Sequence, residues 1–232
     1  MAAASSLTFK EIQDFLLTQL QELQAPIDMT VPKIKAWINM GYKDFVRRTR
    51  AFTNDYDVTT VADQESYSIK AGAFYHVSGG RYIEDSSTEY GIPLRLWPGG
   101  FDNLPRHKVF GTPYHIWVRY AGDNVAVEMG TVPIADTADY TVKVFGYNLP
   151  TKLTSDSQIP VIHEAYHEAL IQYPLWKICN AYAHKSKAIR EKGVIARQEY
   201  LDIVNDGKRD MEDFLSEDSA TIDVYSGHFE DF

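Results

Sequence analysis

The sequence predicts an α+β protein: an antiparallel helical bundle with an inserted small antiparallel β-domain and an extended C-terminal arm. Apolar residues recur every three or four positions at both ends of the 232-residue chain, as in amphipathic helices. In the middle of the chain the period changes to two, as in half-buried strands. The helical period is lost near the C-terminus. We therefore expect residues 1–52 and 151–215 to form the bundle, 53–150 the β-domain and 216–232 the arm.

Composition narrows the class of protein. Apolar content is 44% and charged content is 24%, which is ordinary for a globular chain. The formal net charge of −9 argues against simple electrostatic binding of nucleic acid. Cys179 is the single cysteine, so a disulfide framework is excluded and a reducing compartment is expected. The N-terminus lacks the features of a signal peptide and no apolar run reaches membrane-spanning length, so we expect no membrane partner.

Two helices are predicted at the N-terminus. The first spans residues 8–24 and begins with a capping box formed by Thr8 and Glu11. The second runs from Thr30 to Arg48, with Pro32 in its first turn, where a missing N–H costs nothing. These two helices and a later pair should share one core.

Three arginines end the second helix: Arg47, Arg48 and Arg50. One interpretation is that they stabilise the negative end of the helix dipole. The other is that they contact a phosphate backbone or an acidic neighbouring subunit.

The middle of the chain predicts short strands and one long loop. Residues 57–62 and 66–70 read as a hairpin, and 74–77 and 81–85 as strands around the turn Ser78-Gly79-Gly80. Residues 114–120 and 125–129 read as an antiparallel pair, and 140–147 as a further strand. Residues 91–111 are expected to form a loop carrying Trp97 and Phe101, which either contact a partner or plug the sheet.

A second pair of helices is predicted from Pro160 onward, with a break near Gly193. The first helix has an apolar stripe of Ile162, Tyr166, Ala169, Leu170, Tyr173, Trp176 and Cys179. The second has Tyr200, Val204, Gly207, Met211 and Phe214 at helical spacing. His163, Glu164 and His167 are expected on the opposite, polar side.

His163-Glu164-Ala165-Tyr166-His167 matches the HExxH string of zinc peptidases, in which two histidines hold the metal and the glutamate activates a water. A third ligand is needed. No histidine or glycine follows at the metzincin offset, and Glu191 and Glu199 lie in basic, solvated surroundings. We therefore expect no metal site and no cofactor, and a zinc peptidase stays as the alternative.

The last segment is acidic, with apolar residues spaced along it. Such a segment cannot form its own core, so it is either an arm that orders on a partner or a frayed tail. The residues expected to make the contact are Ile222, Val224, Tyr225, His228, Phe229 and Phe232.

In order of elements and in several short strings, the chain resembles the head-to-tail adaptor (connector) proteins of tailed bacteriophages. The strings are Gly111-Thr112-Pro113-Tyr114 before a strand, Gly146-Tyr147-Asn148-Leu149-Pro150 after one, and the Leu153-Thr154 to Ile159-Pro160 entry to the helix pair. The chain is also similar in plan to the tail tubular protein A type.

The resemblance implies a non-enzymatic virion protein, twelve copies of which form a ring beneath the portal protein. DNA would pass through the lumen without specific binding. The β-domain would face the downstream tail or nozzle protein through Trp97 and Phe101, and the arm would reach the portal. Arg47, Arg48, Arg50, Tyr173 and Trp176 are expected in ring packing or near the lumen. A receptor- or carbohydrate-binding accessory module is the second alternative.

Overall fold

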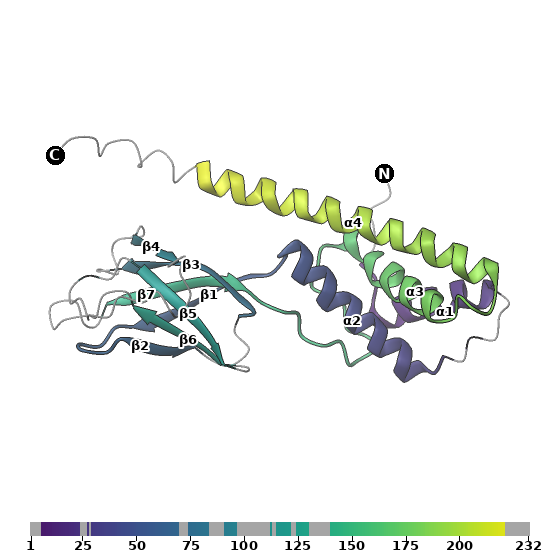
Figure 1. Cartoon of the computed structure of the whole chain (residues 1–232), viewed down its shortest axis with the longest axis horizontal. Helices are drawn as coiled ribbons and strands as arrows, with labels where there is room; N and C mark the ends of the chain where they lie inside the picture. The colour runs from purple at the N-terminus through teal and green to yellow at the C-terminus, as the bar shows by residue number, and fades with distance from the viewer. Residues whose placement is uncertain are drawn as a thin grey trace. The chain divides into compact units, whose positions relative to one another are not determined.

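A computed structural model describes residues 6–23, 27, 29–69, 74–83, 91–96, 112, 115–121, 124–129 and 140–220. The chain divides into two compact units. One unit joins Met1–Ala51 to Pro150–Phe232, and the other is the continuous segment Phe52–Leu149. Helices make up the first unit and strands the second (Figure 1).

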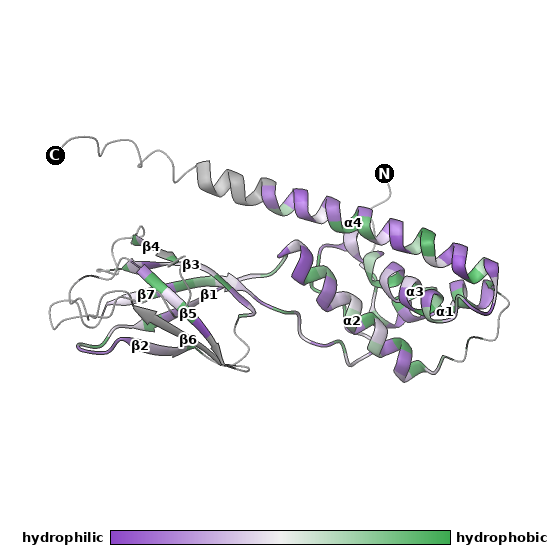
Figure 2. Cartoon of the chain, viewed as in Figure 1, coloured by the Kyte–Doolittle hydropathy of each residue, from purple (hydrophilic) through white to green (hydrophobic). Residues whose placement is uncertain are grey.

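The helical unit is built from segments that lie far apart in the sequence. Its helices are α1 (Phe9–Glu22), α2 (Val31–Thr49), α3 (Ala169–Ala181) and α4 (Lys187–Ala220). The capping box of Thr8 and Glu11 is present, and Pro32 lies in the first turn of α2, both as predicted. Hydrophilic and hydrophobic residues alternate along α2 and α4, as in helices with one buried face (Figure 2).

Helix α3 is the centre of this unit, since it packs against each of the other three helices. Most of its side chains are buried, including Leu170, Leu175 and Ile178, which have no exposed surface. Each such side chain contributes about 1.5–3 kcal/mol by leaving water. Gly41 of α2 lets the helices approach closely, because a Cβ there would lie 3.0 Å from Cδ1 of Tyr173.

Three predicted boundaries in the C-terminal helices are wrong. The first helix begins at Ala169 rather than at Pro160. The chain turns at residues 182–186 rather than at Gly193, which lies inside α4 and packs against Cys179. Its missing side chain serves close packing of α3 on α4, so the glycine does not end a helix. The helical conformation also continues past residue 215 to Ala220.

The other unit contains one seven-stranded sheet among the described residues, in the order β1-β7-β3-β4-β5-β6-β2. The strands are β1 (Thr53–Thr59), β2 (Ser66–Ile69), β3 (His76–Ile83), β4 (Ile92–Leu96), β5 (His115–Ala121), β6 (Asn124–Met129) and β7 (Thr141–Tyr147). Neighbouring strands are antiparallel except β4 and β5, which are parallel.

One face of the sheet encloses a core. Burial alternates along β2 and β7, as expected when one face packs inward. Buried residues from at least five strands meet there, among them Val58, Tyr82, Ile116 and Val144. The end strands β1 and β2 are in contact, and the Tyr67 hydroxyl donates to the carbonyl of Gln64 in the loop between them. The sheet therefore curls on itself.

Several details of the predicted strands need correction. Residues 57–62 and 66–70 do not pair as a hairpin, because β1 pairs with β7 and β2 with β6. Ser78-Gly79-Gly80 is not a turn but the middle of β3, with a register shift between Val77 and Gly79. Glycine is required there because a Cβ on Gly80 would lie 2.9 Å from the Lys143 carbonyl oxygen. Strand β4 also lies inside the stretch predicted as a loop.

The structure is an α+β fold of four helices and a small, largely antiparallel sheet, as the sequence predicts. The antiparallel pairing of β5 with β6 and the strand at Thr141–Tyr147 are confirmed. Within the described part of the chain, no helix combines the length and apolar character needed to cross a bilayer.

Candidate functional site

The HExxH string does not form a regular helix. Glu164–Tyr166 is a single 3-10 turn ahead of α3, and His163 lies at its N-terminal end. The His163 Nδ1 atom accepts a hydrogen bond from the backbone N–H of Ala165 at 3.3 Å. In zinc peptidases the two histidines share one face of a continuous helix, and that geometry is absent from this segment.

His167 is buried, with 2% of its surface exposed, so its predicted place on a polar face is wrong. Its Nδ1 atom accepts from the backbone N–H of Leu7 at 2.9 Å. The neutral ring therefore carries its proton on Nε2, which donates to the carbonyl oxygen of Ile162 at 3.1 Å. Burial is the main cause that lowers the pKa of His167.

Both nitrogens of this imidazole are thus engaged by the backbone, and neither has a lone pair to offer a metal. Glu164 accepts from the Ser6 hydroxyl at 3.0 Å, so it too contacts the N-terminal segment. Across the described residues, no three His, Cys, Asp or Glu side chains are grouped so as to hold a metal ion. The segment functions as an anchor for residues 6 and 7.

Helices α2 and α4 are joined by a charged cluster centred on Asp44. Its Oδ2 atom accepts from the Tyr200 hydroxyl at 2.7 Å and from Nε of Arg48 at 2.6 Å. Burial, followed by the bond to Asp44, raises the pKa of Tyr200. The bond to Asp44 raises the pKa of Arg48. Arg48 therefore lies at an interhelical contact within one chain.

Tyr173 and Trp176 belong to an aromatic cluster that includes Tyr200. The Tyr173 ring meets that of Tyr200 edge-on at 5.2 Å between centroids, and Trp176 stacks on Tyr200 at 6.2 Å. The ammonium group of Lys177 lies 3.9 Å from the centroid of Trp176. Tyr173 is buried inside the chain and Trp176 is half-buried.

The remaining two arginines of the predicted set lie at the end of α2. Arg47 has 65% of its side chain exposed and lies 3.9 Å from Asp44. Arg50 ends the helix in the left-handed conformation with φ of 57°, and its N–H donates to the Val46 carbonyl. Both belong to the outer surface of α2.

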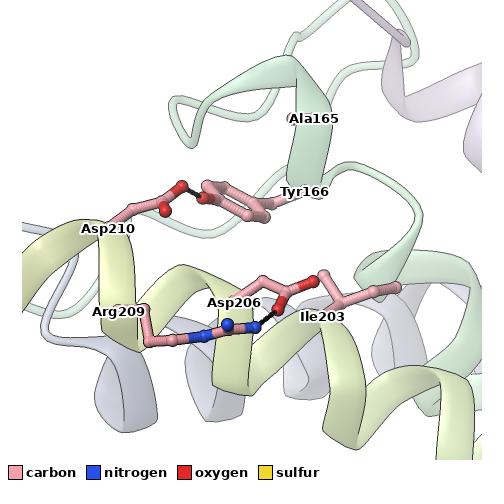
Figure 3. A pocket seen from close by; sticks show the side chains of 6 residues that line it. All are labelled: Ala165, Tyr166, Ile203, Asp206, Arg209 and Asp210. Carbon is pink, nitrogen blue, oxygen red and sulfur yellow. Dashed lines mark hydrogen bonds and ion pairs between the residues drawn. The ribbon is translucent and has the colours of Figure 1, made fainter.

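An open hollow of about 500 Å³ lies between the 3-10 turn and α4 (Figure 3). Ala165 and Tyr166 line one side, and the other is formed by Ile203, Asp206, Arg209 and Asp210 of α4. The Tyr166 hydroxyl donates to Asp210, and Arg209 pairs with Asp206. Burial and the contact with Asp210 raise the pKa of Tyr166 to about 12. The polar groups of the hollow are thus paired with one another.

Some predicted contact residues lie outside the described part of the chain. These are Trp97 and Phe101 of the β-region and the arm residues Ile222, Val224, Tyr225, His228, Phe229 and Phe232. Conversely, sequence reasoning missed Leu7 and Asp44. The contact of Leu7 is made by its backbone, which has no sequence signature, and Asp44 differs from other surface carboxylates only in its tertiary surroundings.

The structure is thus a helical bundle with a curled sheet inserted between α2 and α3, and the HExxH string makes structural hydrogen bonds within it. The model of the family described as SU10 adaptor protein matches residues 7–222. The chain therefore belongs to the SU10 adaptor protein family, and its resemblance to phage head-to-tail adaptors is confirmed. A comparison with curated proteins gives no significant match. The protein is a phage adaptor, a structural component of the virion.

Proposed function

We propose that this protein forms a ring, of twelve copies, between the portal protein and the tail, and that phage DNA passes through its lumen. The family match over residues 7–222 carries this proposal, because it covers both the helical unit and the inserted sheet. A ring needs two different faces on each copy, one for each neighbour. The helical unit offers such faces, since α1, α2 and α4 all pack around α3 and each has an outer surface.

The charge of the chain supports the role of a conduit. DNA that must slide should meet few cations, because every phosphate contact adds to an electrostatic hold. A formal charge of −9 per copy gives a ring that repels DNA overall. The passage would therefore be non-specific.

A structural role without catalysis agrees with the contacts of His167. The string that resembled a zinc site holds the N-terminal segment through Leu7 and Ile162. We therefore assign the protein no enzymatic activity and no cofactor. Zinc added to the protein is expected not to bind in a one-to-one ratio.

We propose that the C-terminal arm docks on the portal and that Trp97 and Phe101 face the downstream tail protein. Support for the arm comes from its composition, which pairs acidic residues with regularly spaced apolar ones. Assembly would take place in the host cytoplasm before DNA ejection.

Portal binding is tested by comparing the full chain with a variant that ends at Ala220, the last residue of α4. Each protein is mixed with purified portal rings, and bound copies are counted by native mass spectrometry. The full chain is expected to bind as a complete ring and the shortened chain to bind at least about tenfold more weakly, a loss of about 1.4 kcal/mol. Undiminished binding of the shortened chain would contradict the role of the arm.

A further inference from the structure

The outer face of α2 is a basic stripe. Positions three and four residues apart share one helix face. The exposed residues at this spacing are Lys33, Ala36, Met40, Lys43, Arg47 and Arg50. No acidic residue lies among them, and Met40 adds an apolar contact with 50% of its surface exposed. We refer to these six residues as the basic stripe.

The basic stripe is opposite to the face that packs inside the chain. Ile34, Ile38 and Phe45 of α2 are fully buried. Thr49 and Phe45 contact α4 at Gly207, where a Cβ would lie 3.1 Å from Thr49 Cγ2. The contact between α2 and α4 of one chain therefore leaves the basic stripe on the exterior.

The C-terminal part of α4 has the opposite charge. Residues 199–220 contain eight Asp and Glu residues against two cations, Lys208 and Arg209. Residues 31–50, which include α2, contain six cations against the single acid Asp44. Surfaces with opposite net charge favour contact with one another.

Glu199 and Asp202 are exposed on one side of α4, whereas Tyr200 and Val204 of the same turns are buried. Asp206 is exposed as well, but it pairs with Arg209 beside the hollow. Ile195, two turns before Asp202 on that side, is 51% exposed and provides an apolar group to meet Met40. We refer to this surface as the acidic face.

We propose that the basic stripe of one copy docks on the acidic face of α4 in the next copy, and that this contact closes the ring. The inference rests on the proposed ring and specifies its interface. The two surfaces are different parts of the molecule, so the contact is head-to-tail and can repeat around a ring. Charged residues around the apolar pair Met40 and Ile195 would fix how the two helices align.

The test reverses one charge on each surface. Lys43→Glu changes the basic stripe, and Asp202→Lys changes the acidic face. Lys152→Glu is the matched control, because Lys152 is an exposed lysine of the helical unit outside α2 and α4. The number of copies per particle is measured by native mass spectrometry with portal rings present, and folding is checked by circular dichroism.

Each single reversal is expected to raise the protein concentration needed for half-assembly by at least about tenfold, since like charges then meet. The control should assemble as the unaltered protein does, and the double variant Lys43→Glu/Asp202→Lys should recover assembly. Normal assembly of both single variants would overturn this interface while leaving the ring intact. A wild-type protein that remains monomeric on the portal would overturn the ring, and with it the interface.

Duplex DNA is the alternative partner for the basic stripe. The same variants distinguish DNA binding from contact with a second copy. Binding to a linear duplex is measured at low salt by fluorescence anisotropy. The interface predicts that Lys43→Glu leaves any DNA binding within about twofold of the control. Loss of DNA binding together with normal assembly would assign the stripe to DNA and overturn the proposal.

Discussion

The backbone N–H of Leu7 donates to Nδ1 of His167 across a separation of 160 residues, at 2.9 Å. This bond joins the segment just before α1 to the turn that precedes α3. Phe9 and Lys10 add backbone bonds to the carbonyls of Gln158 and Asp156. The start of α1 is therefore hydrogen-bonded to the segment that precedes α3.

His167→Ala is expected to lower the free energy of unfolding by about 2–4 kcal/mol. The change leaves the Leu7 N–H and the Ile162 carbonyl without partners and opens a cavity. His163→Ala is the control within the same string, because His163 is exposed and loses the 3.3 Å hydrogen bond from the Ala165 N–H, which should cost no more than about 1 kcal/mol. Chemical denaturation measures both, and equal effects of the two changes would contradict the buried role of His167.

Stability should fall in acid through His167. Its pKa is lowered in the folded protein from the ordinary value of 6.5, so the unfolded chain binds the proton more tightly. Stability is therefore complete above about pH 6.5 and decreases as the pH falls from there toward the folded-state pKa. Urea unfolding of the wild type and of His167→Gln between pH 7.5 and about 5 isolates this contribution. A wild-type curve parallel to that of the variant would refute it.

Tyr200→Phe is expected to lower the free energy of unfolding by about 1.5–3 kcal/mol, because it removes a partly buried hydrogen bond to the carboxylate of Asp44. Arg48 remains as a partner of Asp44, which keeps the loss at the lower end of this range. Tyr56→Phe is the control, because it makes the same chemical change at a half-buried site in the other unit. It should change the free energy of unfolding by no more than about 0.5 kcal/mol. Thermal unfolding followed by circular dichroism compares the two, and an unaffected Tyr200→Phe protein would speak against this cluster.

Gly146→Ala should disrupt the sheet unit. A Cβ at this position of β7 would lie 2.6 Å from the His76 carbonyl oxygen of β3, so the two strands must move apart. Overpacking of this kind costs about 1–3 kcal/mol or more. Gly79→Ala is the matched change, because its Cβ would lie 3.9 Å from the Leu94 carbonyl oxygen, an ordinary van der Waals contact. Equal stability of the two variants would disprove the close approach.

Local sequence patterns predict much of this fold. The capping box of Thr8 and Glu11 and the alternation along Thr141–Tyr147 are local patterns, and the structure confirms both. Local patterns do not show which glycines are needed for close packing between elements distant in sequence. The sequence predicts a helix break at Gly193 and a turn that includes Gly80, yet each glycine allows close packing of neighbouring elements.

In the candidate site, too, a local sequence pattern was visible but the tertiary contacts that determine its structure were not. The string His163 to His167 has the spacing of a metal site, but the spacing is meaningful only on a continuous helix. The backbone of Leu7 and Ile162 binds His167 and holds the segment in another conformation. The pairing of β1 with β7 is likewise a contact between segments far apart in sequence, which no hairpin signal could indicate.

The most direct test of the ring is electron-microscopic imaging of the full chain assembled on purified portal rings. The adaptor account predicts a closed ring of this protein, coaxial with the portal, with an open channel continuous with that of the portal. Particles carrying isolated copies at the periphery of the portal, or portals with no bound protein at saturating concentration, would contradict it.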